Sequence, residues 1–157
     1  QLTLDQLAGI YTGKITNWKE VGGADGTIII YGRESSSGTY EFFKEHVLHK
    51  ADFAHSTQTL SGTAAIVGAV TKDPKGIDYG GAAYTQGGIK QAKLVDAKGV
   101  AVAPTKENVM SGDYPLSRYL FFYLGQKPTG AIDDYIKWVL SPDGQKFVSE
   151  MEYFPLQ

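Results

Sequence analysis

Residues Arg33 to Thr39 carry the side chains of this chain that are best suited to bind an anion. Arg33 is one of only two arginines, and a guanidinium offers a planar fork that pairs with two oxygens of an oxyanion. Ser35, Ser37 and Thr39 add hydroxyl donors, and Gly38 has no side chain to keep a ligand away from the backbone. Together these residue types favour a tetrahedral oxyanion as ligand.

The elements on either side of this run are expected to place it at a ligand-binding edge. Residues 27–31 form a continuous apolar, β-branched run, which predicts a strand buried on both faces. Tyr40, Phe43 and Val47 recur with helical spacing, so a helix is expected to begin near Gly38. Ligands of α/β sheets bind at the carboxyl ends of strands, and a helix N-terminus presents unpaired N–H groups to an anion.

An ordinary structural role accounts for the same residues. Ser37 would cap the helix, and Arg33 would pair with Glu34 or Glu41. The local pattern leaves both interpretations open. The nucleotide-binding pattern G-x-x-x-x-G-K-[ST] is absent, so a nucleoside triphosphate is not indicated.

The rest of the chain alternates helical patterns with short strand patterns. A capping box at Thr3 and Gln6 starts a helix that ends before Gly13. Further helices are expected over 64–70, from 105, over 130–140 and from 142, further strands over 76–80, 92–95, 100–102 and 118–124, and a loop over 49–59. This alternation predicts an α/β fold with a mostly parallel sheet flanked by helices.

Composition excludes several classes of protein. The 157 residues hold 15 Lys+Arg against 17 Asp+Glu, so a basic nucleic-acid binder is not expected. No apolar run is long enough to span a membrane, and the lack of cysteine excludes disulfides and thiol catalysis. The chain begins at Gln1 without a signal-like segment, which is typical of a processed or cut protein. No cofactor is indicated.

Catalysis and metal binding are the competing hypotheses for the polar residues. A serine hydrolase would use Ser37, but no G-x-S-x-G elbow exists, and His46 lies nine positions up the helix, about 13 Å away at 1.5 Å per residue. His55 lies in an expected loop. His46 and His49 share a helix face, with Glu45 or His55 as a further metal ligand, but a solvated polar face is the simpler interpretation. We therefore expect no catalytic residue and no metal site.

Three other features have a structural and a functional interpretation. Residues 61–63 repeat Ser-Gly-Thr before a helix, as a plain N-cap or as another wall of the pocket. Trp18, Tyr79 and Tyr84 are expected in the core or at a cleft edge. The aromatic run over 119–123 is most simply a buried strand.

Five stretches resemble, in order, motifs of one known family. These are residues 4–18 (L-x-x-I-F-x-G-K-I-x-N-W in the family), 33–39 (R-x-x-x-S-G-T), 76–79 (A-I-G-Y), 114–118 (Y-P-I-S-R) and 140–156 (L-S-P-E-G-Q-x…G-Y-x-P-L). The chain thus resembles the phosphate-binding proteins of phosphate ABC transporters over essentially its whole length.

The resemblance implies a type II periplasmic-binding-protein fold, in which two α/β lobes clamp phosphate and deliver it to a membrane permease. It implies a periplasmic or extracellular location. Arg33, Ser37, Gly38 and Thr39 would be the phosphate contacts of the second lobe. Ser35 completes the expected site and stands where family members often carry an Asp that supports the arginine, and Asp78 replaces a usual Gly.

The family's first lobe has no counterpart in this chain. Residues 1–112 correspond to the phosphate-loop lobe, and residues 113–157 to the crossover strand and C-terminal helices that complete the other lobe in the family. The missing lobe would come from another chain, a dimer mate or the uncut protein. If it is absent, the aromatic run over 119–123 would be exposed and drive dimerisation.

The sequence therefore predicts non-catalytic binding of inorganic phosphate, for uptake or sensing. A single open lobe would bind weakly, near millimolar, because charge-assisted hydrogen bonds of about 1.5–3 kcal/mol each are offset by at least ~4 kcal/mol of association cost. The alternative is an interaction module that pairs with itself or with another chain, with the ligand secondary.

Overall fold

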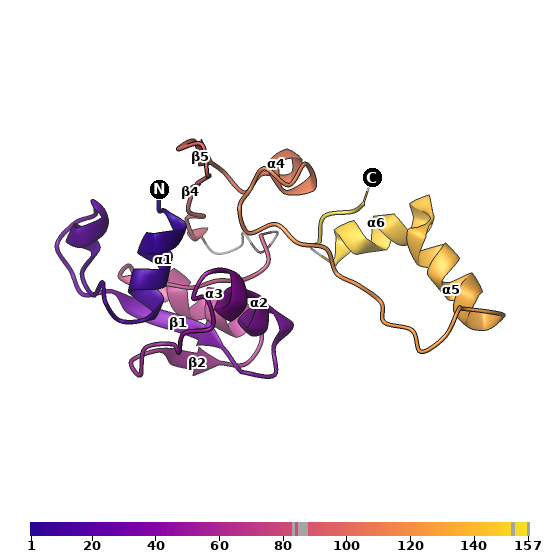
Figure 1. Ribbon diagram of the computed structural model, residues 1–157, viewed down its shortest axis with the longest axis horizontal. Coiled ribbons are helices and arrows are strands. Elements are labelled where there is room, and N and C mark those ends of the chain that lie inside the picture. Colours follow the sequence, from indigo (N-terminus) through magenta and orange to yellow (C-terminus); the bar gives the residue numbers. More distant parts are fainter. Residues whose placement is uncertain (83, 85–87, 152, 157) are drawn as a thin grey trace.

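The computed structural model describes residues 1–82, 84, 88–151 and 153–156. Figure 1 shows an α/β body, then a long connection and a pair of helices that lie to one side of the body. The helices are α1 (Leu4–Tyr11), the 3-10 helix η1 (Trp18–Val21), α2 (Gly38–His46), α3 (Thr63–Lys72), α4 (Lys106–Met110), α5 (Ala131–Leu140) and α6 (Pro142–Glu150). The strands are β1 (Ile29–Arg33), β2 (Gln58–Leu60), β3 (Gly76–Ile77), β4 (Leu94–Val95) and β5 (Ala101–Val102).

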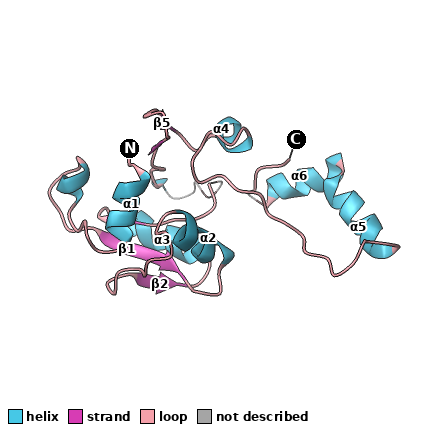
Figure 2. Ribbon diagram, in the orientation of Figure 1, coloured by secondary structure: helices cyan, strands magenta, loops and turns pink. Residues whose placement is uncertain are grey.

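The body contains a three-stranded parallel sheet in the order β2-β1-β3. Figure 2 shows β1 beside β2 in this sheet. Strand β1 pairs with β2 through residues 31–33 and with β3 through residues 29–30. Strands β4 and β5 form a separate antiparallel hairpin. The predicted α/β class with a mostly parallel sheet is confirmed.

All three strands of the sheet differ from the sequence prediction, and β3 covers residues 76–77 instead of 76–80. Strand β1 covers residues 29–33 instead of 27–31, so Arg33 is its last residue. Strand β2 begins inside the stretch 49–59 that was expected to be a loop. Its residues Gln58 and Thr59 are exposed, so no apolar pattern reveals the strand, and only its pairing with β1 defines it.

Local capping signals start several helices where the sequence predicts. The side chain of Thr3 accepts a hydrogen bond from the backbone of Gln6, and the Gln6 side chain accepts one from the backbone of Thr3. Thr105 caps α4 and Ser141 caps α6 through their hydroxyl oxygens. Pro142 occupies the first turn of α6, where its missing N–H costs nothing.

The hydrophobic core lies between the sheet and helices α1 and α2. At its centre the rings of Tyr11 and Phe43 meet edge to face at 4.7 Å, and the rings of Phe43 and Tyr79 stack at 4.1 Å. Tyr79 is thus a core residue, as expected. The cluster comprises Leu2, Leu7, Ile10, Tyr11, Ile28, Ile30, Phe43, Val47, Leu48, Ile77, Tyr79 and Leu94, with Tyr114 and Leu116 packed against it.

The prediction of a strand over 118–124 is wrong. The structure has no strand there, and the side chains of Tyr119 to Tyr123 are 60–91% exposed. A buried strand needs a neighbouring strand and a covering layer, and the described part of the chain supplies neither at this place. The exposed arrangement expected in the absence of a first lobe is the one observed.

The last two helices form a corner with its own hydrogen bonds. The buried side chain of Gln145 donates from Nε2 to the Val139 carbonyl at 2.8 Å and accepts at Oε1 from the Leu156 N–H at 2.7 Å. Tyr135 stacks on Trp138 with ring centroids 6.2 Å apart. Among the described residues, no helix is long and apolar enough to cross a membrane.

Candidate oxyanion site

The edge at which β1 and β2 both end brings two helix N-termini beside Arg33. Arg33 is the last residue of β1 and lies opposite Leu60, the last residue of β2. Because the two strands are parallel, the helices that follow them, α2 from Gly38 and α3 from Thr63, begin at the same edge. Backbone N–H groups and a guanidinium thus meet at one place, as an oxyanion requires.

The guanidinium of Arg33 is held by three hydrogen bonds. Its Nε donates to Glu34 Oε2 at 3.4 Å and its Nη2 to Glu34 Oε1 at 3.2 Å. Its Nη1 donates to the hydroxyl of Thr63 at 3.2 Å. The Arg33 backbone N–H donates to the Tyr79 hydroxyl at 3.2 Å, which ties the end of β1 to the core. Of the two pairing partners considered from sequence, Glu34 is the one observed.

The Glu34 carboxylate itself lies at the start of α3. Hydrogen bonding from Arg33 lowers the pKa of Glu34, and backbone N–H groups of Glu34 and Gly62 lower it further. Helix α3 begins after Gly62 without a side-chain cap. The side chain of Glu34 therefore places an internal anion against the helix N-terminus and the arginine.

Ser37 caps α2 and is buried, with 7% of its surface exposed. Its Oγ accepts from the N–H groups of Thr39 at 3.2 Å and Tyr40 at 3.4 Å. Within the part of the chain that the structure describes, this leaves the N–H of exposed Gly38 as the open donor of the first turn. Capping does not use the hydroxyl proton of Ser37, so the two interpretations made from sequence are compatible.

Ser35 is exposed in the turn between β1 and α2. The Ser37 N–H closes this turn by donating to the Glu34 carbonyl at 3.0 Å. The carboxylate that accompanies Arg33 is supplied by Glu34, one position before the Ser35 that replaces the family's Asp. The structure thus places Ser37, Gly38 and Thr39 at the start of α2. Arg33 lies at the end of β1 with its guanidinium bonded to Thr63 at the start of α3, and Ser35 lies in the turn between β1 and α2.

Three residues at this edge of the sheet are not predicted as site residues from the sequence. Thr63 accepts a hydrogen bond from the Arg33 guanidinium. The Ser-Gly-Thr over residues 61–63, which repeats the one over 37–39, is the sequence pattern that points to this residue. Glu34 was considered only as a structural partner. Arg118 lies 79 positions from Thr39 in the sequence, yet its Nη2 is 3.5 Å from the Thr39 hydroxyl. Only the fold reveals this last contact.

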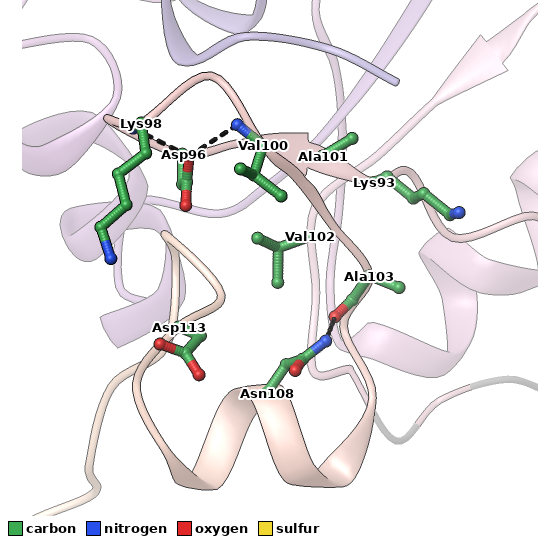
Figure 3. Close-up of a pocket in the computed structure, with 9 residues that line it drawn as sticks. All are labelled: Lys93, Asp96, Lys98, Val100, Ala101, Val102, Ala103, Asn108 and Asp113. Atoms are coloured by element: carbon green, nitrogen blue, oxygen red, sulfur yellow. Dashed lines mark hydrogen bonds between the residues drawn. The ribbon is translucent and has the colours of Figure 1, made fainter.

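The hollow of about 500 Å³ drawn in Figure 3 lies elsewhere, between the β4–β5 hairpin and α4. Its polar groups serve local structure. The Asp96 carboxylate accepts from the N–H groups of Lys98 and Val100, and the Asn108 amide donates to the Ala103 carbonyl (Figure 3). The hollow contains none of the predicted site residues.

Of the histidines that are candidate metal ligands or bases, His46 is engaged in local contacts. His46 lies with Nδ1 3.0 Å from the Phe42 carbonyl, and its ring stacks on that of Phe42. In the described ranges, no group of three His, Asp or Glu side chains is arranged to hold a metal ion. Trp18 donates from Nε1 to the Lys75 carbonyl at 3.0 Å, at the edge of the body. Tyr84 is half-buried.

Comparison with known proteins shows which family this chain belongs to. A family model described as PBP superfamily domain matches residues 1–143. The chain is 33% identical to the phosphate-binding protein PstS of Pseudomonas aeruginosa over 99% of its length and 53% of that protein's. It is 37% identical to PstS of Staphylococcus epidermidis over 92% of its length and 46% of that protein's.

Solved structures show the same fold. A phosphate ABC transporter substrate-binding protein from Clostridium perfringens, solved with bound phosphate, matches with a TM-score of 0.82 and 34% identity over 99% of this chain and 63% of that chain. An ABC-type phosphate transport receptor from Vibrio cholerae matches with a TM-score of 0.79 and 26% identity, over 97% of this chain and 62% of that chain.

The fold and the family match define a periplasmic-binding-protein domain of type II, and the chain belongs to the PBP superfamily. Within that superfamily it belongs to the PstS phosphate-binding protein family. It spans about half the length of the curated relatives it matches. These relatives are described as binding proteins, in agreement with the prediction of a non-catalytic role.

Proposed function

We propose that this chain binds inorganic phosphate at the edge formed by Arg33 and the start of α2, as a non-catalytic lobe. The observation that carries the proposal is that α2 and α3 both begin at the edge where the parallel strands β1 and β2 end, with Arg33 at the end of β1 and its guanidinium bonded to Thr63 at the start of α3. The phosphate bound to the Clostridium perfringens protein supports the choice of oxyanion.

Each predicted site residue has a role in this proposal. The three hydrogen bonds of Arg33 leave two of its five N–H donors without an acceptor in the described part of the chain, and these two would bind phosphate oxygens. Gly38 offers its N–H, and Ser37 and Thr39 offer hydroxyls. Ser35, exposed at the rim, would donate its hydroxyl from the solvent side.

The proposal is tested by calorimetric titration of the folded protein with phosphate and, separately, sulfate. Wild-type protein is expected to bind phosphate with an affinity near millimolar, because only one open lobe contacts the ligand. Arg33→Ala is expected to weaken binding about tenfold or more, through loss of charge-assisted hydrogen bonds. Comparison of the two anions shows which one the lobe prefers.

Lys14→Ala is the matched control, since it removes one positive charge from an exposed position outside the site. It is expected to leave the titration unchanged. A folded wild-type protein that shows no saturable heat at millimolar phosphate would overturn the proposal. Equal losses of phosphate affinity in Arg33→Ala and Lys14→Ala would also overturn it.

The physiological part of the proposal follows from family membership. We infer that the chain acts in phosphate uptake or sensing outside the cytoplasm, in the periplasm or at the cell exterior, with an ABC permease as partner. The matching substrate-binding protein and transport receptor support this role. Loss of phosphate uptake in cells that carry Arg33→Ala, at unchanged protein level, is the expected result, and unimpaired uptake would contradict it.

A second candidate function is favoured by the exposed apolar face of residues 119–156. It includes Tyr119, Leu120, Phe121, Phe122, Tyr123, Ile132, Tyr135, Leu140, Phe147 and Leu156, each more than 45% exposed. A face of this extent on a protein surface marks an interaction site. We propose that residues 113–157 dock on a second α/β lobe, equivalent to the half of the relatives that this chain does not match.

A further inference from the structure

Arg118 approaches the oxyanion site from a segment distant in sequence. Its Nη2 lies 3.5 Å from the hydroxyl of Thr39, and 3.8 Å from the position that a Cβ would take on Gly38. Its Cζ lies 4.9 Å from the centre of the Phe42 ring. The guanidinium therefore covers the first turn of α2, next to the open N–H of Gly38.

The body of the protein holds the segment that carries Arg118. The Tyr114 N–H donates to the Asn108 carbonyl at 2.9 Å, and the Ser117 N–H donates to the Tyr114 carbonyl at 3.0 Å. The side chains of Tyr114 and Leu116 pack against the core. The cation–π contact with Phe42 then orients the guanidinium over α2.

The charges around the site give Arg118 a particular importance. Glu34 accepts two hydrogen bonds from the Arg33 guanidinium, so this pair contributes no net charge. Arg118 is exposed, and no carboxylate of the described residues lies within 4.0 Å of its nitrogen atoms. The uncompensated positive charge beside Gly38 and Thr39 is therefore that of Arg118.

We propose that Arg118 is a second phosphate-binding arginine, which supplies the net positive charge that Arg33 lacks. This inference rests on the proposed function. Phosphate held by Arg33 and the N–H of Gly38 would accept a further hydrogen bond from Arg118, on the side of α2 that faces solvent. An unpaired cation favours the dianion over the monoanion, because Coulomb attraction scales with ligand charge.

The test is a phosphate titration of wild type, Arg118→Ala and Arg118→Lys, followed through heat and through the amide chemical shifts of Gly38 and Thr39. Arg118→Ala is expected to weaken binding about tenfold, and Arg118→Lys is expected to recover part of the loss. Lys14→Ala again serves as the charge control. Phosphate titrations at a pH above and at a pH below the second pKa of phosphate show whether Arg118 contacts the ligand. A direct contact changes the preference for the dianion, whereas a purely structural effect does not.

Wild type is expected to bind more tightly at the higher pH, where phosphate is a dianion, and Arg118→Ala is expected to lose most of this preference. If wild type binds phosphate and Arg118→Ala binds equally well with the same pH dependence, the role of Arg118 is refuted and the proposed function stands. If wild type does not bind, the proposed function itself has failed. A loss of affinity with the pH preference unchanged would also refute the direct contact.

Discussion

Arg33 and Glu34 are neighbours in the sequence, and their side chains turn to the same side to form an ion pair at the site. The Glu34 oxygens accept from a guanidinium and from the backbone N–H of Gly62, the same kinds of donor that a phosphate oxygen uses. The carboxylate thus resembles a built-in ligand. It orients Arg33 when no anion is bound, and it competes with an anion that arrives.

Replacing Glu34 by Gln is expected to strengthen phosphate binding a few-fold at neutral pH. The change removes a negative charge next to the incoming dianion and leaves the amide oxygen to accept from Arg33. Calorimetric titration at matched ionic strength measures the effect. Glu41→Gln, on the exposed first turn of α2, is the control for a general change in charge. Weaker binding by Glu34→Gln would show that orientation of Arg33 outweighs competition.

The pH dependence of this effect has a definite sign. Because hydrogen bonds from Arg33 hold the pKa of Glu34 below its ordinary value of 4.5, the stability that Glu34 contributes is present above that value. It is lost as the pH falls through the lowered pKa of the folded state. Wild type and Glu34→Gln are therefore expected to converge in both stability and phosphate affinity in acid, once the pH has fallen below this lowered pKa.

At the scale of elements, helices α5 and α6 meet at a close-packed corner. A Cβ on Gly144 would lie less than 3.0 Å from the carbonyl oxygens of Trp138 and Val139, which are backbone atoms with no freedom to rotate away. The Gln145 amide then joins the Val139 carbonyl to the Leu156 N–H across the corner. The geometry of the pair thus depends on the absence of a side chain at Gly144.

Gly144→Ala is expected to destabilise the α5–α6 pair by about 1–3 kcal/mol, through overpacking against backbone. Amide hydrogen exchange in α5 and α6 measures this locally, and faster exchange is expected there with no change in β1 or α2. Gly125→Ala is the matched control, because nothing lies within 4 Å of its added Cβ. Unchanged protection of α6 in Gly144→Ala would contradict the packing derived for this corner.

At the scale of the whole molecule, the apolar surface is distributed unevenly. The core cluster is made by residues up to Leu94, whereas the exposed large apolar side chains lie mostly from Tyr119 onward. The body buries its apolar residues, and the C-terminal segment presents them to solvent. Such a segment is expected to bury its apolar face on another lobe.

Mixing this chain with the separately produced unmatched half of the Staphylococcus epidermidis relative is expected to give a one-to-one complex. Phosphate affinity should rise at least tenfold, because a second lobe adds contacts to the same ligand. Sedimentation measures the assembly. Phe121→Ser with Tyr123→Ser is expected to abolish it, and Val100→Ser, an exposed change on the β4–β5 hairpin, is expected to preserve it.

The alternative occupants of this face give different sedimentation results. Self-association of the chain alone, unaffected by the added lobe, would assign the face to a second copy. A chain that stays monomeric at high concentration and does not bind the added lobe would overturn both docking on a second lobe and self-association.

The sequence by itself determined the class of fold and the position of the loop for which we propose anion binding. Apolar periodicity, the capping box at Thr3, the N-cap at Ser141 and the Gly-Thr that follows Ser37 act over a few residues, so they can be read without knowledge of distant contacts. The five family motifs then indicated the PstS family, which the comparisons confirmed. The role of Arg33 and its neighbours in binding stays a prediction.

Only the tertiary structure decided which distant residues share the site and which apolar residues are buried. Strand β2 and the contact of Thr63 with Arg33 depend on the parallel pairing of β1 with β2. The approach of Arg118 to Thr39 depends on the path of the chain after the body. Residues 119–123 are exposed because no other element of the described chain covers them, and no local sequence pattern indicates this. Local signals fix local geometry, because they act within a few residues, whereas burial and charge pairing depend on the positions of all the other elements.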